Sequence, residues 1–185
     1  MKKSLLLFVF LGFALLSKAQ STTASSGDTY HAFKFDIGLG YAIPSAATGS
    51  GTKAGVTFTL QPHYRLSDDF AIGLRLEGAG LGYEDETGKT KISFLESYCA
   101  TGEYYLMEGG FRPFVGAGAG FFDQSSLKAS NGNATLVNSA TNVGFFPEVG
   151  FEAGHFRMSA DYDVAGKSNN YLAFKIGFFF GGGKK

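Results

Sequence analysis

The sequence predicts an all-β protein, an eight-stranded antiparallel up-and-down transmembrane β-barrel preceded by a cleaved signal peptide. Three observations predict it. Apolar residues alternate with small or polar ones in eight successive segments, and the joins between those segments are alternately short and long. The chain is also rich in Gly and Phe, with 27 and 20 copies. Gly disfavours helices, whereas Phe is common in strands.

The first residues have the order of a secretory signal peptide. A basic pair, Lys2 and Lys3, precedes an apolar run over residues 5–16, and the small residues Ser17 and Ala19 follow at the −3 and −1 positions of a cleavage site. The apolar run is too short to span a bilayer comfortably. We therefore expect a signal peptide at 1–19, a flexible N-terminal lead-in at 20–29, an outer-membrane β-barrel at 30–180 and a C-terminal tail at 181–185.

The alternation is clearest in the first segment. Its odd positions are apolar and its even positions are small or charged: Phe33, Phe35, Ile37, Leu39, Tyr41 and Ile43 against Lys34, Asp36, Gly38, Gly40 and Ala42. Successive side chains of a strand point to opposite faces, so one face of this strand is wholly apolar. A helix would spread the same residues around its whole surface, which excludes a helix here.

The same pattern returns in seven more segments, near residues 56–66, 70–77, 92–106, 112–122, 143–152, 156–164 and 172–180. The fourth strand is the least regular, because Glu96 falls on its apolar face. We expect that stretch either to rise above the bilayer or to carry a β-bulge. In the fifth, Gly116, Gly118 and Gly120 fall on the inward face, where small residues would let side chains from neighbouring strands cross the lumen.

The connections give an independent indication of a membrane barrel. Those after strands two, four and six are short, at 67–69, 107–111 and 154–155. Those after strands one, three, five and seven are mostly longer and polar, at 45–52, 84–91, 123–142 and 165–170. Transmembrane barrels have short periplasmic turns and longer extracellular loops, which places both termini in the periplasm. The longest connection, 123–142, is expected to be a mobile loop and the first candidate for contacts with a surface partner.

Two kinds of barrel fit an amphipathic meander. In a soluble lipocalin-like barrel the apolar face points inward, and in an outer-membrane barrel it points outward to lipid. The polar face here is rich in small residues, which suits a narrow interior, and the strands have the length of tilted membrane strands. An even number of strands also lets the sheet close without an edge, as lipid demands. We therefore expect the protein in the cell outer membrane, with outer-membrane lipid around it.

The inward positions carry nearly balanced charges, and these are our candidate site residues, a lumen charge network. They are Lys34, Asp36, Arg65, Arg75, Glu77, Glu103, Arg112, Glu148, Glu152, Arg157, Asp161, Asp163 and Lys175. The interior of an eight-stranded barrel is only just wide enough for its own side chains, so opposite charges there should pair. This favours a plugged, ion-paired lumen. The alternative is a narrow channel for small or hydrophobic molecules, with these charges setting its selectivity.

Several other classes of function find no support in the sequence. Basic and acidic residues are equal in number, 16 each, so charge gives no indication of nucleic acid as a partner. The three histidines are scattered, which indicates neither a metal site nor an enzyme, and no cofactor is expected. His63 is interpreted as a hydrogen-bonded histidine of the interior and Cys99, the single cysteine, as a small inward filler. The Gly116–Gly120 run lacks the spacing of a nucleotide-binding loop.

One hairpin carries a resemblance to a known family. Glu103-Tyr-Tyr-Leu106, followed by Arg112-Pro-Phe-Val-Gly-Ala-Gly-Ala-Gly120, resembles the small outer-membrane β-barrel proteins of Gram-negative bacteria, of the OmpX, OmpW and OmpA-barrel kinds. The resemblance implies an adhesion or defence surface, an envelope anchor or a passage for small hydrophobic molecules. It also implies a barrel-insertion machinery that reads a C-terminal aromatic residue. Here Phe180 is followed by Gly181-Gly-Gly-Lys-Lys185, a short basic tail similar to that of Bacteroidetes-type barrels.

Overall fold

The computed structural model describes residues 30–45, 52–84, 90–130, 133–166 and 170–182. Eight strands account for almost all of them: β1 (Phe33–Pro44), β2 (Thr52–Arg65), β3 (Phe70–Glu84), β4 (Thr90–Tyr105), β5 (Phe111–Ser130), β6 (Asn133–Ala153), β7 (Phe156–Asp163) and β8 (Tyr171–Gly181). None of the described residues forms a helix long and apolar enough to cross a membrane. The expected signal peptide and lead-in lie outside the described residues, as do most residues of the joins β1–β2 and β3–β4 and residues 167–169 of the join β7–β8.

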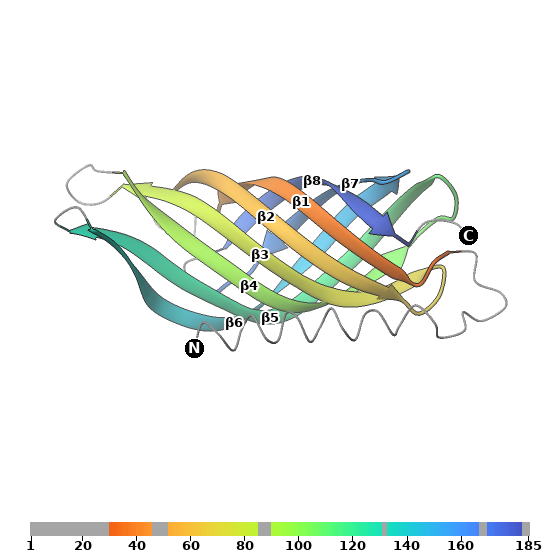
Figure 1. Cartoon of the computed structure of the whole chain (residues 1–185), viewed down its shortest axis with the longest axis horizontal. Coiled ribbons are helices and arrows are strands. Elements are labelled where there is room, and N and C mark those ends of the chain that lie inside the picture. Colours follow the sequence, from red (N-terminus) through yellow and green to blue (C-terminus); the bar gives the residue numbers. More distant parts are fainter. Residues whose placement is uncertain (1–29, 46–51, 85–89, 131–132, 167–169, 183–185) are drawn as a thin grey trace.

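The strands form one closed antiparallel barrel in sequence order, as the sequence predicts (Figure 1). Each strand pairs with its neighbours along the chain, and β1 closes the ring against β8. Ile37, for example, lies opposite Leu60 of β2 on one side and Phe178 of β8 on the other. Closure leaves the body of the sheet without an edge, so the backbone groups that face lipid are satisfied within the barrel.

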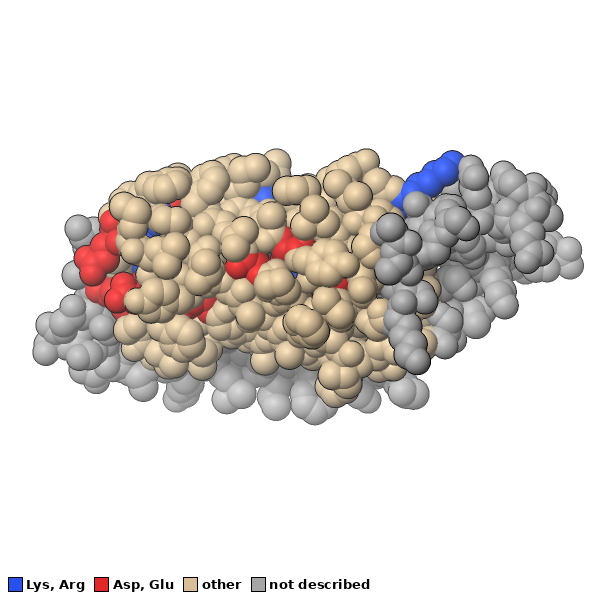
Figure 2. All heavy atoms as spheres, turned by 180° about the vertical axis from the view of Figure 1, so that it is seen from behind, with Lys and Arg blue, Asp and Glu red and all other residues tan. Residues whose placement is uncertain are grey.

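Large apolar side chains cover the outside of the barrel. Leu74 is 56% exposed, Phe178 is 60% exposed and Val143 is 77% exposed. In the apolar core of a water-soluble barrel these side chains would be buried. Figure 2 shows one face of this surface, on which uncharged residues dominate and charged ones are scattered. Because the charged and small residues of the same strands face inward, the apolar face meets lipid and the soluble-barrel alternative is excluded.

The end of the barrel with the short connections carries both described ends of the chain. The turn between β6 and β7 has two residues, Gly154 and His155, and Gly154 adopts a φ of 63° that favours glycine. In the turn between β4 and β5, Gly109 has a φ of 120°. We call this end, which lies at the right of Figure 1, the short-turn end.

One sequence expectation about the other end is wrong, and one of the two alternatives expected for β4 is absent. Most of 123–142 is not a loop, because β5 and β6 continue as a paired ladder as far as Ser130 opposite Asn133. Two paired antiparallel strands satisfy each other's backbone groups, and a polar composition does not reveal this. The expected bulge in β4 is also absent from the described pairings, and irregularities lie instead at Lys53/Val56 and Gln124/Ser125.

Glu96 keeps its place in the regular ladder of β4 and points outward. It accepts a hydrogen bond from the hydroxyl of Tyr98, with 3.0 Å between the oxygens, and lies opposite Asp123 of β5. The other expectation, that this stretch rises above the bilayer, stays a prediction. At the chain's C-terminal side, β8 runs through Gly181, opposite Lys34, so its ladder extends one residue into the expected tail.

Candidate functional site

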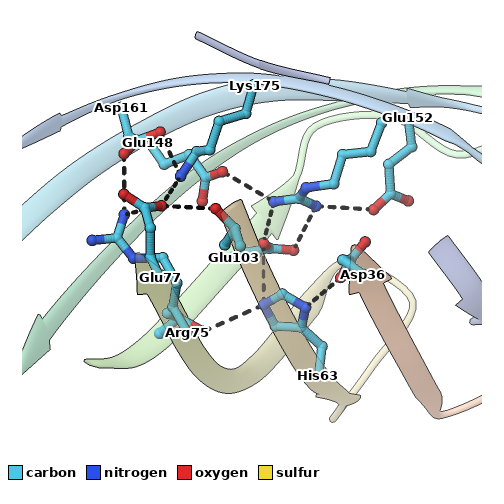
Figure 3. A network of polar contacts seen from close by, with 12 residues as sticks. Asp36, His63, Arg75, Glu77, Glu103, Glu148, Glu152, Asp161 and Lys175 are labelled. Carbon is cyan, nitrogen blue, oxygen red and sulfur yellow. Dashed lines mark hydrogen bonds and ion pairs between the residues drawn. The ribbon is translucent and has the colours of Figure 1, made fainter. Parts of the chain in front are cut away.

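All thirteen candidate residues point into the barrel, and each is at most 5% exposed. They come from all eight strands, and Figure 3 shows how the side chains of those that it labels converge. We describe them as two adjoining groups. The upper group, farther from the short-turn end, contains Arg75, Glu77, Asp161, Asp163 and Lys175. The lower group contains Lys34, Asp36, Arg65, Glu103, Arg112, Glu148, Glu152 and Arg157.

Arg75 of β3 is the centre of the upper group. Its Nη1 lies 3.0 Å from Oδ1 of Asp161, and its Nη2 donates to Asp163, both from β7. Its guanidinium also lies 3.4 Å from the ring centroid of Phe146. Because Arg75 has no exposed surface, its charge is compensated by these contacts and not by water.

Lys175 of β8 connects the same carboxylates from the other side. Its Nζ lies 2.8 Å from Oε2 of Glu77 and 2.8 Å from Oδ2 of Asp161. Tyr171 donates to the other oxygen of Glu77 over 2.7 Å. The carboxylates of Glu77, Asp161 and Asp163 have oxygens within 4.8 Å of one another, a spacing that a metal ion could bridge. Since Arg75 and Lys175 already bind these oxygens, the arrangement is that of an ion-pair cluster.

Arg157 of β7 organises the lower group. Its Nη2 lies 2.5 Å from Oε1 of Glu103 and 3.2 Å from Oε1 of Glu148, while its Nη1 lies 3.1 Å from Oε1 of Glu152. One guanidinium therefore holds three carboxylates from two different strands. Lys34 of β1 adds a contact of 2.5 Å to Glu152, which ties the first strand to the sixth across the lumen.

His63 of β2 joins the lower group, as its interpretation as an interior histidine requires. Its Nδ1 lies 2.8 Å from Oδ2 of Asp36 and its Nε2 lies 3.2 Å from Oε1 of Glu103. The ring is 1% exposed and is also within 3.3 Å of the hydroxyl of Thr101. Every ring nitrogen thus has a protein partner, which is the arrangement of a structural histidine.

The charges are packed between aromatic side chains that our sequence reasoning did not single out. Tyr105, Phe114, Phe122, Phe146 and Tyr171 are each at most 1% exposed inside the barrel. Period-two alternation could have placed these five rings inside the barrel, because each of them is next to an outward-facing residue. The signal is weak, since in pairs such as Phe121–Phe122 the composition does not show which ring faces inward.

Glycines make the room for these rings, in keeping with the role expected for small inward residues. A Cβ atom added to Gly118 would lie 2.5 Å from the ring of Phe146, and one added to Gly150 would lie 2.6 Å from the ring of Phe114. Both distances are well below van der Waals contact. The rings of Phe146 and Phe114 therefore occupy the space that side chains at Gly118 and Gly150 would take.

The space left between the two groups is small. A cavity of about 20 Å³ is lined by Asp36, Gln61 and Lys175 among others. That volume suits a single water, and Oδ1 of Asp36 and Nε2 of Gln61 have no protein partner. The interior at this level is thus a packed, ion-paired core, and the pairing expected of the lumen charges is present for all of them except Arg112.

Comparison with known proteins agrees with this architecture. Residues 6–177 match the family described as the outer membrane protein beta-barrel domain. The chain belongs to this family. It is therefore an integral β-barrel protein of the cell outer membrane, surrounded by lipid. No curated protein matches the sequence significantly.

Solved structures show the same fold. Neisserial surface protein A (NspA) is 16% identical, with a TM-score of 0.65 over 80% of this chain and 96% of its own. The attachment invasion locus protein Ail of Yersinia pestis, solved with the heparin analogue sucrose octasulfate, is 13% identical, with a TM-score of 0.52 over 83% of this chain and 99% of its own. At these identities the likeness concerns the fold alone.

Proposed function

We propose that the protein is a closed outer-membrane barrel that conducts no solutes and has a structural or surface-interaction role. The ion-paired lumen carries this proposal. Arg157 and Lys34 join β1, β4 and β6 across the interior, and Arg75 and Lys175 do the same for β3, β7 and β8. A solute path through this level would separate buried opposite charges, which costs several kcal/mol for each ion pair that is broken.

Permeability of liposomes that carry the refolded protein tests the closed state. We expect no flux of ions or small sugars above that of empty vesicles, because the packed groups leave no continuous path. A heat-dependent gel shift confirms refolding, and a general porin in the same vesicles serves as the positive control. Reproducible, size-limited flux would contradict the proposal and favour the narrow channel.

The surface role is supported by the β5–β6 hairpin. The pairing of β5 with β4 ends at Ser126 opposite Ser93, and no described residue pairs with the β7-facing side of β6 between Asn133 and Gly144. The hairpin therefore stands beyond its neighbours and projects at the left of Figure 1. A paired hairpin on a rigid barrel presents one unpaired strand edge to a partner. That Ail, which has the same fold, has been solved with a heparin analogue lends the surface role further support.

Labelling in intact cells tests the orientation that this role needs. We expect a cysteine at Thr135 of the hairpin (Thr135→Cys) to react with a membrane-impermeant maleimide. We expect Ser67→Cys, in the exposed β2–β3 turn, to react only after the outer membrane is permeabilised. The native Cys99 is 2% exposed and provides the unreactive background. The reverse pattern would place the hairpin in the periplasm and remove it as a cell-surface contact.

We further propose that the barrel is not an enzyme and that the insertion machinery reads its last aromatic residues. His155 lies in an exposed turn, where Nδ1 is 3.0 Å from the carbonyl oxygen of Phe179, whereas Ser159 is 6% exposed inside the lumen. The two do not form a nucleophile–base pair. Phe180 is 59% exposed on the outside of β8, where a membrane-embedded receptor would reach it.

A further inference from the structure

A second, much larger cavity lies at the short-turn end of the barrel. Its volume is about 510 Å³, and it is lined by residues of the turns β4–β5 and β6–β7, of the segment before β1 and of the end of β8. Five of the lining residues are glycines, Gly109, Gly110, Gly154, Gly181 and Gly182, so backbone makes much of the wall. The size is in the range of pockets that bind small molecules. We call this cavity the vestibule.

Arg112 of β5 is the notable charged residue of the vestibule. It is 4% exposed, and its Nη2 donates a hydrogen bond to the backbone oxygen of Asp68 over 2.5 Å. Its Nε and Nη1 atoms are buried and have no hydrogen-bond partner. Among the described residues, Lys34, Arg65, Arg75, Arg157 and Lys175 all form ion pairs, and Arg112 does not.

Arg65 of β2 lies beside Arg112 and is only weakly compensated. Its Nη2 is 3.4 Å from Oε2 of Glu152, while its Nε and Nη1 atoms have no partner. Glu152 is itself shared, because its other oxygen lies 2.5 Å from Lys34 and 3.1 Å from Arg157. The vestibule wall therefore carries two buried guanidiniums and one carboxylate that is already used by the lower group.

Two tyrosines hold these guanidiniums in place. The carbon at the centre of the Arg112 guanidinium lies 4.0 Å from the ring centroid of Tyr30 and 4.1 Å from that of Tyr105, and for Arg65 the distances are 4.9 and 4.7 Å. Tyr105 belongs to the barrel, but Tyr30 precedes β1 and is held to the turns, with its hydroxyl 2.9 Å from the backbone nitrogen of Gly109. Stacking covers the guanidinium faces and leaves hydrogen bonding to their edges.

We propose that the vestibule is a binding site for a carboxylate-bearing ligand on the short-turn side of the membrane, with Arg112 as the principal binding residue and Arg65 as the second. A carboxylate supplies what the site lacks, namely one negative charge and acceptor oxygens for buried guanidinium nitrogens. The glycine-lined walls add backbone groups that suit the flanking amides of a peptide terminus. The site adjoins the lower group at the short-turn end, but Arg112 takes no part in the described ion pairs that close the lumen, so the proposal does not depend on whether the barrel conducts solutes.

Arginine side-chain NMR of the full mature chain, refolded in uncharged detergent, tests the proposal with succinate as the probe at fixed ionic strength. We expect saturable shifts of the Nε–Hε signals of Arg112 and Arg65, with a Kd on the order of 1 mM for so small a ligand. The signals of Arg75 and Arg157, which lie within the ion-pair groups, should stay in place. Shifts that chloride reproduces, or the absence of saturation, would overturn the proposal.

Variants locate the site and its ligand. Arg112→Gln should raise the Kd at least tenfold, whereas Lys53→Gln at the opposite rim should leave it unchanged; equal affinity in all three proteins would overturn the assignment. If Arg112→Gln does not fold, Arg65→Gln takes its place, and we expect it to raise the Kd as well. N-acetyl-Gly-Gly should bind and its C-terminal amide should not. Tighter binding of this peptide acid than of succinate identifies peptide termini as the ligand, and equal binding identifies free small acids.

Discussion

Replacing Arg75 with alanine is expected to lower the free energy of unfolding by about 3–5 kcal/mol, because it leaves buried carboxylates without their counter-ion. Asp161 and Asp163 would each lose a hydrogen bond in a region with no exposed surface. The ring of Phe146 would lose its cation as well. Denaturant unfolding of the refolded barrel in micelles measures the change. Because the chain has no tryptophan, unfolding is followed by far-UV circular dichroism.

Two further variants separate charge loss from general disruption. Lys53→Ala removes a charge from the exposed rim and should change the unfolding free energy by no more than about 1 kcal/mol. Arg75→Lys keeps the charge but loses the two-pronged contact, so its effect should fall between the other two. If Arg75→Ala and Lys53→Ala had the same unfolding midpoint, the lumen charges would not hold the barrel together.

Arg157 and Glu103 form the second pair for which a large effect is expected. Replacing either with methionine should lower the unfolding free energy by about 3–5 kcal/mol, because each substitution removes from the buried interior the charge that is the other residue's nearest ion-pair partner. The two atoms in contact are 2.5 Å apart, and the side chains are 5% and 1% exposed. Methionine fills a similar volume, so the effect is electrostatic and not that of a cavity.

The sequence predicts the strands and their facing well, because period-two alternation depends only on chain geometry and on the contrast between lipid and lumen. It places Leu74 outside and Arg75 inside from neighbouring positions, and the structure agrees. It also predicts that the lumen charges pair, since a narrow interior tolerates nothing else. The sequence does not predict which charge binds which partner. Arg157 contacts Glu103, which lies 54 positions away, and only the register of the whole barrel brings them together.

Two features of the molecule could not be predicted from the sequence, for physical reasons. The β5–β6 hairpin has a polar composition that is equally typical of a loop. Its pairing is stabilised by backbone hydrogen bonds, which do not depend on the identity of the side chains. Arg112 looked like one more member of a balanced network. In the structure its Nη2 donates to the backbone oxygen of Asp68 and its guanidinium stacks on the ring of Tyr30, and neither residue lies near it in sequence.

The coupling energy between Arg157 and Glu103 tests the central claim, a lumen closed by mutually compensating charges, most directly. A double-mutant cycle compares the unfolding free energies of wild type, Arg157→Met, Glu103→Met and the double variant. We predict that the double variant is more stable than the sum of the single losses allows, by about 1–3 kcal/mol, because each single change already removes the contact between the two charges and the sum counts that loss twice. Strictly additive losses would contradict the claim and show that these buried charges do not depend on each other.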